Sequence, residues 1–468
     1  MTDEPEPPPG NVVQFLPPEQ DLEEVTYASV IKWFNVEHSV ILIGGQTRVL
    51  RIFKDENKGW WTHSFMKFQD FANYYVNRKM VVGQKTIPQT KVWLESSGRR
   101  TYKACVFQPG APTVINGAVN LWRGYAAAPV QGDWSPMRDH IFKVLANENG
   151  VAFDYIMGWT ADMLQHPGRQ GQVALISRGA EGAGKSLFGR MLCKAIGPSA
   201  IHISSAEHLL GKHNDHLAYC VFLFSDEAFW PGDKAAMGAL KRLITEPTLL
   251  IEPKFLPKLS MPNFLHVYAA SNYQWIVPAA TGTRRYAGFD AARKFIGNQS
   301  YFDAIYNCMD HGGTEAMMYD LINYNLSSYN IRNIPMTETL VSQVDHSLDP
   351  IDQWYVGLLD SGQLPGAQDR DPRFALSGNL YPSALMSSPR LKQTLSEHQL
   401  GRYLREECGC ERGRAQTQDH HRGWVFPRLD KAREAWCEKH PGWPWSEGHD
   451  DWTADATAEA NRGDEPFR

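Results

Sequence analysis

Eight consecutive residues carry the clearest chemical signal in this chain. Four residues separate two glycines before a Lys-Ser pair, which is the phosphate-binding loop pattern. Its glycines allow backbone N–H groups to surround a phosphate at a helix N-terminus. The lysine of such a loop reaches the β- and γ-phosphates of ATP, and the hydroxyl of the serine ligates Mg²⁺. A nucleotide site with ATP and Mg²⁺ as cofactors is therefore predicted at Gly179, Ala180, Glu181, Gly182, Ala183, Gly184, Lys185 and Ser186.

Two adjacent carboxylates follow the next apolar segment. Residues 221–225 read as a buried strand, and Asp226 and Glu227 come directly after it. We expect Asp226 to hold Mg²⁺ together with Ser186, and Glu227 to orient or deprotonate the attacking water. The alternative is that the pair only caps the following helix. The phosphate-binding loop upstream favours the catalytic interpretation.

A third apolar run, residues 264–271, ends in a polar amide and is followed by two arginines. Asn272 stands where a side chain could contact the γ-phosphate or the attacking water, although asparagine is also a common turn residue. Arg284 and Arg285 lie further along the chain. An arginine supplied by a neighbouring subunit often stabilises a transferring phosphoryl group. We expect Arg285 in that role with Arg284 as the second candidate, and an exposed basic turn is the alternative.

Residues 248–260 have the pattern of a hairpin with a proline-edged turn. Lys254 and Lys258 lie in or beside this turn. Basic and aromatic residues at such a tip can grip the backbone of single-stranded nucleic acid. We therefore predict DNA contacts at both lysines, with an ordinary solvated turn as the alternative.

These side chains must be positioned by a regular scaffold. The apolar runs at 173–177, 221–225 and 264–271, together with the helical spacing after residue 185, predict an α/β P-loop NTPase core at residues 168–349. Its central parallel sheet would be flanked by helices. Residues 23–167 mix strand and helix patterns, and residues 1–22 are acidic and rich in proline, which is typical of disorder.

The C-terminal part has a different pattern. A helix near 399–404, a basic loop at 409–421, a strand at 423–427 and a helix at 429–437 predict a winged helix within residues 350–437. Residues 438–468 read as an acidic, mostly disordered tail. A winged helix would present phosphate-binding side chains from one helix and the wing, so DNA contacts are predicted at Arg402, Arg405, Arg412, Arg414 and Arg422.

Composition limits the possible partners and surroundings. The chain of 468 residues has 47 lysines and arginines against 52 aspartates and glutamates, a formal net charge of −5. Nucleic acid would therefore bind to a local basic patch. Seven irregularly spaced cysteines favour reduced thiols in the cytoplasm. No apolar run is long enough to span a membrane, so no membrane contact is expected.

The order of the motifs resembles a known family. A phosphate-binding loop, an Asp-Glu strand, a basic hairpin, a Ser-Asn strand and paired arginines within residues 179–285 resemble the superfamily 3 helicases of viruses and plasmids, a branch of the AAA+ ATPases. Residues 225–230, 243–247, 251–254 and 284–286 resemble phage and prophage primase-helicase proteins more closely. Residues 107–110 and 120–124 resemble the region before the helicase in the same family.

The resemblance implies an ATP-driven hexameric ring that translocates on single-stranded DNA during replication in a bacterial host cell. A separate primase or polymerase is a further candidate partner. The stretch before Pro112 is too short for the primase domain of larger members and contains no Asp-x-Asp, so we do not expect priming. The alternative function is a DNA-binding AAA+ ATPase that loads or regulates a replication partner without unwinding.

Overall fold

The computed structural model describes residues 25–205, 214–227, 234–252, 258–272, 285–335, 337, 348–368, 371–414, 421–440, 443, 445–446 and 451–454. The predictions for residues 1–22, Lys254, Arg284 and residues 455–468 lie outside these ranges. The chain divides into two compact units. The first contains Met1–Val106 and Pro112–Leu121, and the second contains Phe107–Ala111 and Trp122–Arg468.

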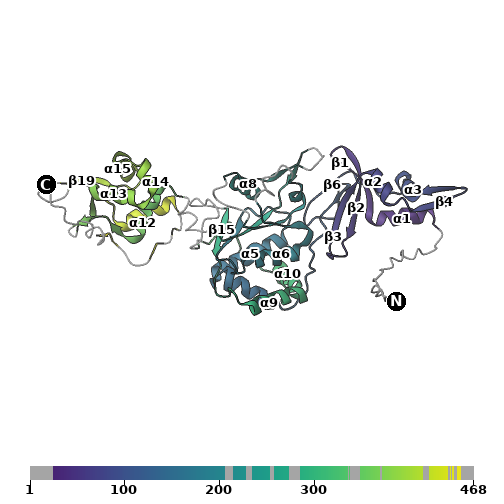
Figure 1. The fold of residues 1–468 in the computed structure, drawn as a ribbon, viewed down its shortest axis with the longest axis horizontal. Helices are drawn as coiled ribbons and strands as arrows, with labels where there is room; N and C mark the ends of the chain where they lie inside the picture. Colours follow the sequence, from purple (N-terminus) through teal and green to yellow (C-terminus); the bar gives the residue numbers. More distant parts are fainter. Residues whose placement is uncertain are drawn as a thin grey trace, which may run out of the picture. The chain divides into compact units, whose positions relative to one another are not determined.

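The first unit is a mixed α+β domain, and Figure 1 shows its three helices gathered beside a three-stranded sheet. This antiparallel sheet has the order β1-β2-β3. Its core joins Phe34, Val49, Phe71 and Trp93, all fully buried. The elements are α1 (Tyr27–Glu37), β1 (His38–Ile43), β2 (Gln46–Lys54), β3 (Trp61–Met66), α2 (Phe68–Tyr74), β4 (Lys79–Val82), β5 (Lys85–Pro88), α3 (Gln89–Glu95), β6 (Cys105–Val106), β7 (Val114–Ile115) and β8 (Ala118–Asn120).

The centre of the second unit is a five-stranded parallel sheet in the order β10-β11-β14-β9-β15. The prediction of an α/β core with a parallel sheet is confirmed. Its elements are α4 (Ser135–His140), η1 (Ile141–Leu145), α5 (Gly150–Gln165), β9 (Ala174–Arg178), α6 (Lys185–Ile196), η2 (Gly197–Ser199), β10 (Ala200–Ile203), η3 (Asp215–Tyr219), β11 (Phe222–Asp226), α8 (Lys234–Thr245), β12 (Thr248–Ile251), β13 (Leu259–Pro262), β14 (His266–Ser271), β15 (Tyr286–Asp290), α9 (Gln299–Cys308), η4 (Met309–Gly313) and α10 (Thr314–Ile322).

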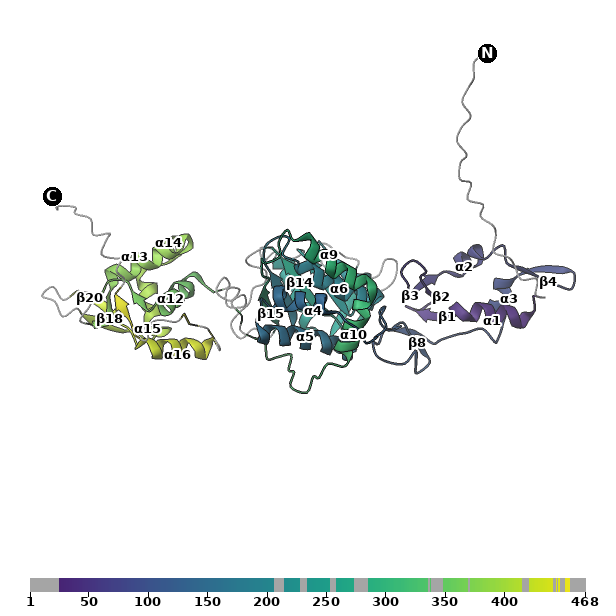
Figure 2. The same cartoon turned by 90° about the horizontal axis from the view of Figure 1, so that it is seen from below.

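The composition of the central strands explains their place in this sheet. The first four residues of β9 and of β11 are buried, and all six of β14 are. Strands covered on both faces read as continuous apolar runs, which is why these segments do not alternate with polar residues. Figure 2 shows α5, α6, α9 and α10 around strands β14 and β15. The carboxyl ends of the parallel strands therefore lie along one edge, where the polar residues begin.

The compact units divide at a different place from the predicted boundary at residue 167, since residues 122–167 lie in the second unit. Helix α5 packs against the central sheet. The indole Nε1 of Trp159, a fully buried residue, donates to the carbonyl oxygen of Val173 at 2.9 Å, and its ring contacts His266 at 5.8 Å between centroids. Sequence patterning shows that a helix is amphipathic but does not show which sheet it covers.

The C-terminal segment combines helices with a four-stranded sheet in the order β17-β18-β20-β19. Its order of elements includes the predicted helix at 399–404, strand at 423–427 and helix at 429–437. They are α12 (Pro350–Ser361), β16 (Gln363–Leu364), β17 (Ala367–Gln368), β18 (Asp371–Leu376), α13 (Ser377–Ser387), α14 (Pro389–Thr394), α15 (Glu397–Glu406), β19 (Glu411–Arg414), β20 (Arg422–Val425), α16 (Leu429–Lys439) and β21 (Thr453–Ala454).

The prediction of a disordered tail from residue 438 is wrong for its described part. Strand β21 pairs with β16, and Trp452 is only 2% exposed. The indole Nε1 of Trp452 donates to the carbonyl oxygen of Pro427 at 2.7 Å, and its ring contacts Phe426 at 5.5 Å between centroids. Net negative charge suggested disorder, but burial of the tryptophan ring and pairing with β16 give this segment a fixed place.

Three buried histidines should make the folded protein less stable in acid. His38, His140 and His266 are at most 1% exposed, and burial lowers the pKa of each to about 4. The unfolded chain takes up these protons below about pH 6.5, whereas the folded chain does not until about pH 4. The free energy of unfolding should therefore fall between pH 6.5 and pH 4, by up to about 3 kcal/mol per histidine.

Urea denaturation at several pH values between 7.5 and 4 checks this prediction. A His140→Gln variant retains hydrogen-bonding groups but cannot titrate, so its stability should fall less steeply. Equal pH dependence of the variant and the wild-type chain would contradict the role of His140.

Across the described ranges, every helix is too short or too polar to cross a bilayer.

Candidate active site

The phosphate-binding loop connects β9 to α6 at the carboxyl edge of the sheet. Gly182 and Gly184 adopt φ angles of +75° and +96°, a region that favours glycine. A Cβ atom on Gly184 would lie 2.6 Å from Cε1 of His140 and 2.9 Å from Cε1 of Phe302. Nε2 of His140 lies 3.0 Å from the carbonyl oxygen of Gly184. The glycines thus allow the conformation of the loop, and the buried imidazole of His140 packs against it at Gly184.

Lys185 projects back across the loop from the first position of α6. Its ammonium donates to the carbonyl oxygens of Gly179 at 2.9 Å and Ala180 at 2.8 Å, and to Oδ1 of Asn272 at 2.8 Å. Lys185 is 5% exposed, and burial lowers its pKa, although the nearby carboxylates of Glu227 and Asp226 oppose that shift. A partly desolvated cation here is poised to bind an anion such as a phosphate.

Ser186 and Asp226 meet at the same edge. Oγ of Ser186 donates to Oδ1 of Asp226 at 2.7 Å. Ser186 is the second residue of α6 and Asp226 ends β11, so their contact depends on the packing of the helix on the sheet. A hydroxyl and a carboxylate beside a phosphate-binding loop are the oxygen ligands that Mg²⁺ prefers. The two residues that the sequence suggested for the metal therefore fit it.

Glu227 and Asn272 form the other side of this edge. Nδ2 of Asn272 donates to Oε1 of Glu227, and the backbone N–H of Glu227 donates to the carbonyl oxygen of Ala270 at 2.9 Å. Strand β14 lies between β9 and β11, so Asn272 contacts both the loop lysine and the carboxylate. The φ of Glu227 is +57°, an unfavourable left-handed conformation for a glutamate. Such strain is often found at functional sites.

A cavity of about 680 Å³ surrounds these groups, within the usual range for small-molecule sites. It also contains residues that the sequence did not single out. His202 lies on β10 with its ring stacked on Phe224, and its Nε2 is 3.6 Å from Oδ2 of Asp226. No motif marks an isolated histidine on an edge strand. The other additional lining residues are Leu187, Arg190, Ser204, Gln299, Phe302 and Tyr306.

Arg285 lies away from this cavity. It immediately precedes β15, and its carbonyl oxygen accepts from the N–H of Ala174 at the amino end of β9. Because β9 and β15 are parallel over five residues, Arg285 is separated from the loop by roughly 16 Å of strand. Arg285 therefore cannot complete the site of its own chain. Arg284 lies outside the described residues.

The predicted hairpin is present, with β12 and β13 antiparallel. Lys258 immediately precedes β13, and its Nζ pairs with Oε1 of Glu252 at 2.6 Å. Its side chain is 62% exposed. Lys254 lies outside the described residues.

The five C-terminal arginines lie on one helix and on the neighbouring pair of antiparallel strands. Arg402 and Arg405 lie on α15, whereas Arg412 and Arg414 lie on β19 and Arg422 lies on β20. Only Arg405 among them forms a described ion pair, with Glu406 at 3.3 Å.

Comparison with known proteins gives a fold relationship. A model for a family of unknown function, DUF5906, matches residues 177–285, the stretch that contains every nucleotide-site motif. No curated protein matches the chain significantly. Among solved structures, the apo NrS-1 C-terminal region (305–718) covers 86% of this chain and 100% of its own length, at 14% identity and a TM-score of 0.58.

The chain resembles the NrS-1 C-terminal region in fold. A second structure of that region, its A form, covers 85% of this chain and 98% of its own length, at 14% identity and a TM-score of 0.61. The likeness extends over most of the chain, including parts outside the family match. At this identity it concerns the fold alone.

Proposed function

We propose that this chain is an ATP-dependent DNA helicase of the phage replicative type, acting as an oligomeric AAA+ ring on single-stranded DNA. One observation carries the proposal. Lys185, Ser186, Asp226, Glu227 and Asn272 come from three separate segments and meet in hydrogen bonds at one sheet edge. These are the kinds of groups that bind a nucleoside triphosphate with its Mg²⁺ and activate a water molecule.

The geometry supports a division of roles in hydrolysis. Lys185 would bind the β- and γ-phosphates, and Ser186 and Asp226 would hold Mg²⁺, which supplies positive charge to the phosphates. Glu227 would accept a proton from the attacking water, with Asn272 orienting that carboxylate and the γ-phosphate. The left-handed backbone of Glu227 directs its carboxylate toward Asn272.

The position of Arg285 supports an assembly in which subunits share sites. Since Arg285 cannot reach the loop of its own chain, we propose that it acts on the nucleotide of a neighbouring copy. Homogeneous Arg285→Ala protein should then lose about 1000-fold or more in turnover. Mixing it with Lys185→Ala protein should restore part of the activity, because one interface would combine an intact loop with an intact arginine.

ATPase turnover measured across mixing ratios checks this prediction. The matched control is Arg293→Ala, which removes an exposed arginine downstream of β15. Wild-type turnover in homogeneous Arg285→Ala protein would overturn the assignment. Absence of rescue at every ratio would exclude a shared site of this kind.

Strand displacement tests the helicase function itself. The full chain is incubated with forked DNA bearing 3′ or 5′ single-stranded tails, with ATP and Mg²⁺. ATP-dependent displacement on one fork polarity, absent in Lys185→Ala protein, is the expected result. ATP hydrolysis stimulated by DNA without any displacement would overturn the helicase proposal while leaving the ATPase intact.

One contact favours the alternative of a DNA-binding ATPase that loads or regulates a replication partner. The ammonium of Lys258 is paired with Glu252, which leaves less free positive charge for gripping DNA. Changing Lys254 and Lys258 to alanine separates the two functions. A helicase should lose unwinding, whereas a loader should retain nucleotide-dependent association with DNA and with a primase or polymerase.

A further inference from the structure

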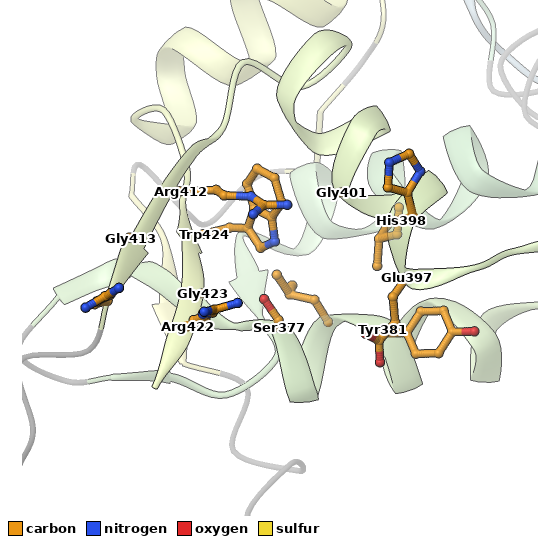
Figure 3. Close-up of a pocket in the computed structure, with 13 residues that line it drawn as sticks. Ser377, Tyr381, Glu397, His398, Gly401, Arg412, Gly413, Arg422, Gly423 and Trp424 are labelled. Atoms are coloured by element: carbon orange, nitrogen blue, oxygen red, sulfur yellow. The ribbon is translucent and has the colours of Figure 1, made fainter. Parts of the chain in front are cut away.

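A hollow in the C-terminal segment has a basic wall. It has a volume of about 740 Å³ and lies between the start of α13, the first half of α15 and the β19–β20 ribbon (Figure 3). Arg412, Arg414 and Arg422 line the ribbon side. His398 lies on α15, and Glu397 is the only carboxylate in the lining. The hollow thus carries three guanidinium groups against one carboxylate.

The register of the ribbon places its arginines on one face. Arg412 pairs across the strands with Trp424, and Arg414 pairs with Arg422. Because side chains alternate along a strand, these four residues share a face. Like charges directly opposite each other destabilise an antiparallel ribbon. The described ion pairs of this segment join other cations, Arg405, Arg428, Lys431 and Lys439, to carboxylates.

Helix α15 extends the same surface. His398 and Gly401 line the hollow, and Arg402 and Arg405 follow at helical spacing, so these four residues share one side of the helix. Both arginines are exposed. A Cβ on Gly401 would lie 3.1 Å from Cζ2 of Trp424, so the glycine permits the close approach of helix and ribbon. The cationic face therefore continues from the ribbon to Arg402 on the helix, whereas Arg405 beyond it pairs with Glu406.

The aromatic groups of the hollow, Trp424 and the half-buried Tyr381, indicate which form of nucleic acid fits. The hydroxyl of Tyr381 donates to the carbonyl oxygen of Leu395 at 2.9 Å. Sites for single strands expose aromatic rings on which bases stack. Trp424 is only 5% exposed, and the guanidinium carbon of Arg412 lies 5.4 Å from its ring centroid. The face of Trp424 is therefore covered, and the guanidinium groups of the ribbon are the main charged groups offered to a ligand. Planar guanidinium groups match the oxygens of phosphates.

We propose that this face binds the phosphate backbone of duplex DNA, with the ribbon arginines on phosphates and α15 directed toward a groove. The proposal goes beyond the motor, because it assigns the C-terminal arginines to the duplex and not to the translocated single strand. Such a site would hold the protein on double-stranded DNA while the ATPase acts on a single strand. It requires no nucleotide.

The test uses the full chain carrying Lys185→Ala, so that the motor is inactive. Binding to a blunt duplex and to a single strand of equal length is measured by fluorescence anisotropy, without nucleotide, from 50 to 200 mM salt. Arg414→Ala/Arg422→Ala should weaken duplex binding and reduce the salt slope of log K by about 2. Single-strand binding should be unchanged.

The matched control is Arg428→Ala/Lys431→Ala, which removes two cations already paired with Asp430 and Glu434. It should leave the duplex salt slope near that of the parent. Equal effects of both double variants would overturn the proposal, and so would a loss confined to the single strand. Arg414→Lys/Arg422→Lys keeps the charge and should retain most duplex binding. That result would show that the loss in the alanine variant comes from the missing charge and not from misfolding. Because the motor is inactive throughout, either result is independent of unwinding.

Discussion

Replacing Lys185 with alanine should reduce ATP hydrolysis by at least about 100- to 1000-fold, the loss typical when a group that stabilises transition-state charge is removed. The ammonium of Lys185 is the only cation that the structure places against both Gly179 and Asn272 within the described site. Alanine removes its contact with the phosphates. The fold should persist, because Lys185 stands at the first position of α6, where alanine is a good helix former.

Steady-state phosphate release and the binding of a fluorescent ATP analogue check this prediction, together with thermal unfolding. Lys194→Ala is the matched control, because Lys194 lies on the same helix but pairs with Asp310 away from the loop. Its turnover should remain close to wild type. Normal turnover in Lys185→Ala protein of unchanged thermal stability would contradict the assignment of this loop as an ATP site.

Changing Glu227 to glutamine should separate binding from hydrolysis. A glutamine has nearly the same shape and can still contact Asn272, but it cannot accept a proton from water. We expect turnover to fall by about 100- to 10,000-fold, as for loss of a general base. ATP affinity should change little, because Lys185, Ser186 and Asp226 are untouched.

Rapid-quench hydrolysis and equilibrium ATP binding distinguish these outcomes. Glu246→Gln, which changes an exposed glutamate beyond α8, is the matched control and should behave as wild type. If Glu227→Gln lowered ATP affinity and turnover equally, Glu227 would act in binding and the proposed proton transfer would be wrong.

The arrangement of the candidate site was largely predictable because each of its parts is set by a short local pattern. Gly184, Lys185 and Ser186 form a contiguous motif whose conformation depends on glycine and on the helix that follows. Asp226 and Asn272 each end an apolar run, and the carboxyl ends of parallel strands must share one edge. Their convergence therefore follows once the sheet is assumed to be parallel.

Other features depended on packing over long distances. His202 could not be singled out, because its approach to Asp226 requires β10 to pair with β11. The sequence placed Arg285 close to the motifs, whereas strand direction puts it at the opposite edge. Trp452 lies in an acidic stretch, and its burial depends on packing against Phe426, which is far away in the sequence.

By itself, the sequence determined the chemical groups of this protein: a phosphate-binding loop, paired carboxylates, a strand-end amide and clustered arginines. Only the tertiary structure decided which of them act together. It joined Lys185 to Asn272, separated Arg285 from the loop, and placed Arg414 opposite Arg422 on a basic wall. The reason is physical, since residue type sets what a side chain can do, while strand order and register set what it can reach.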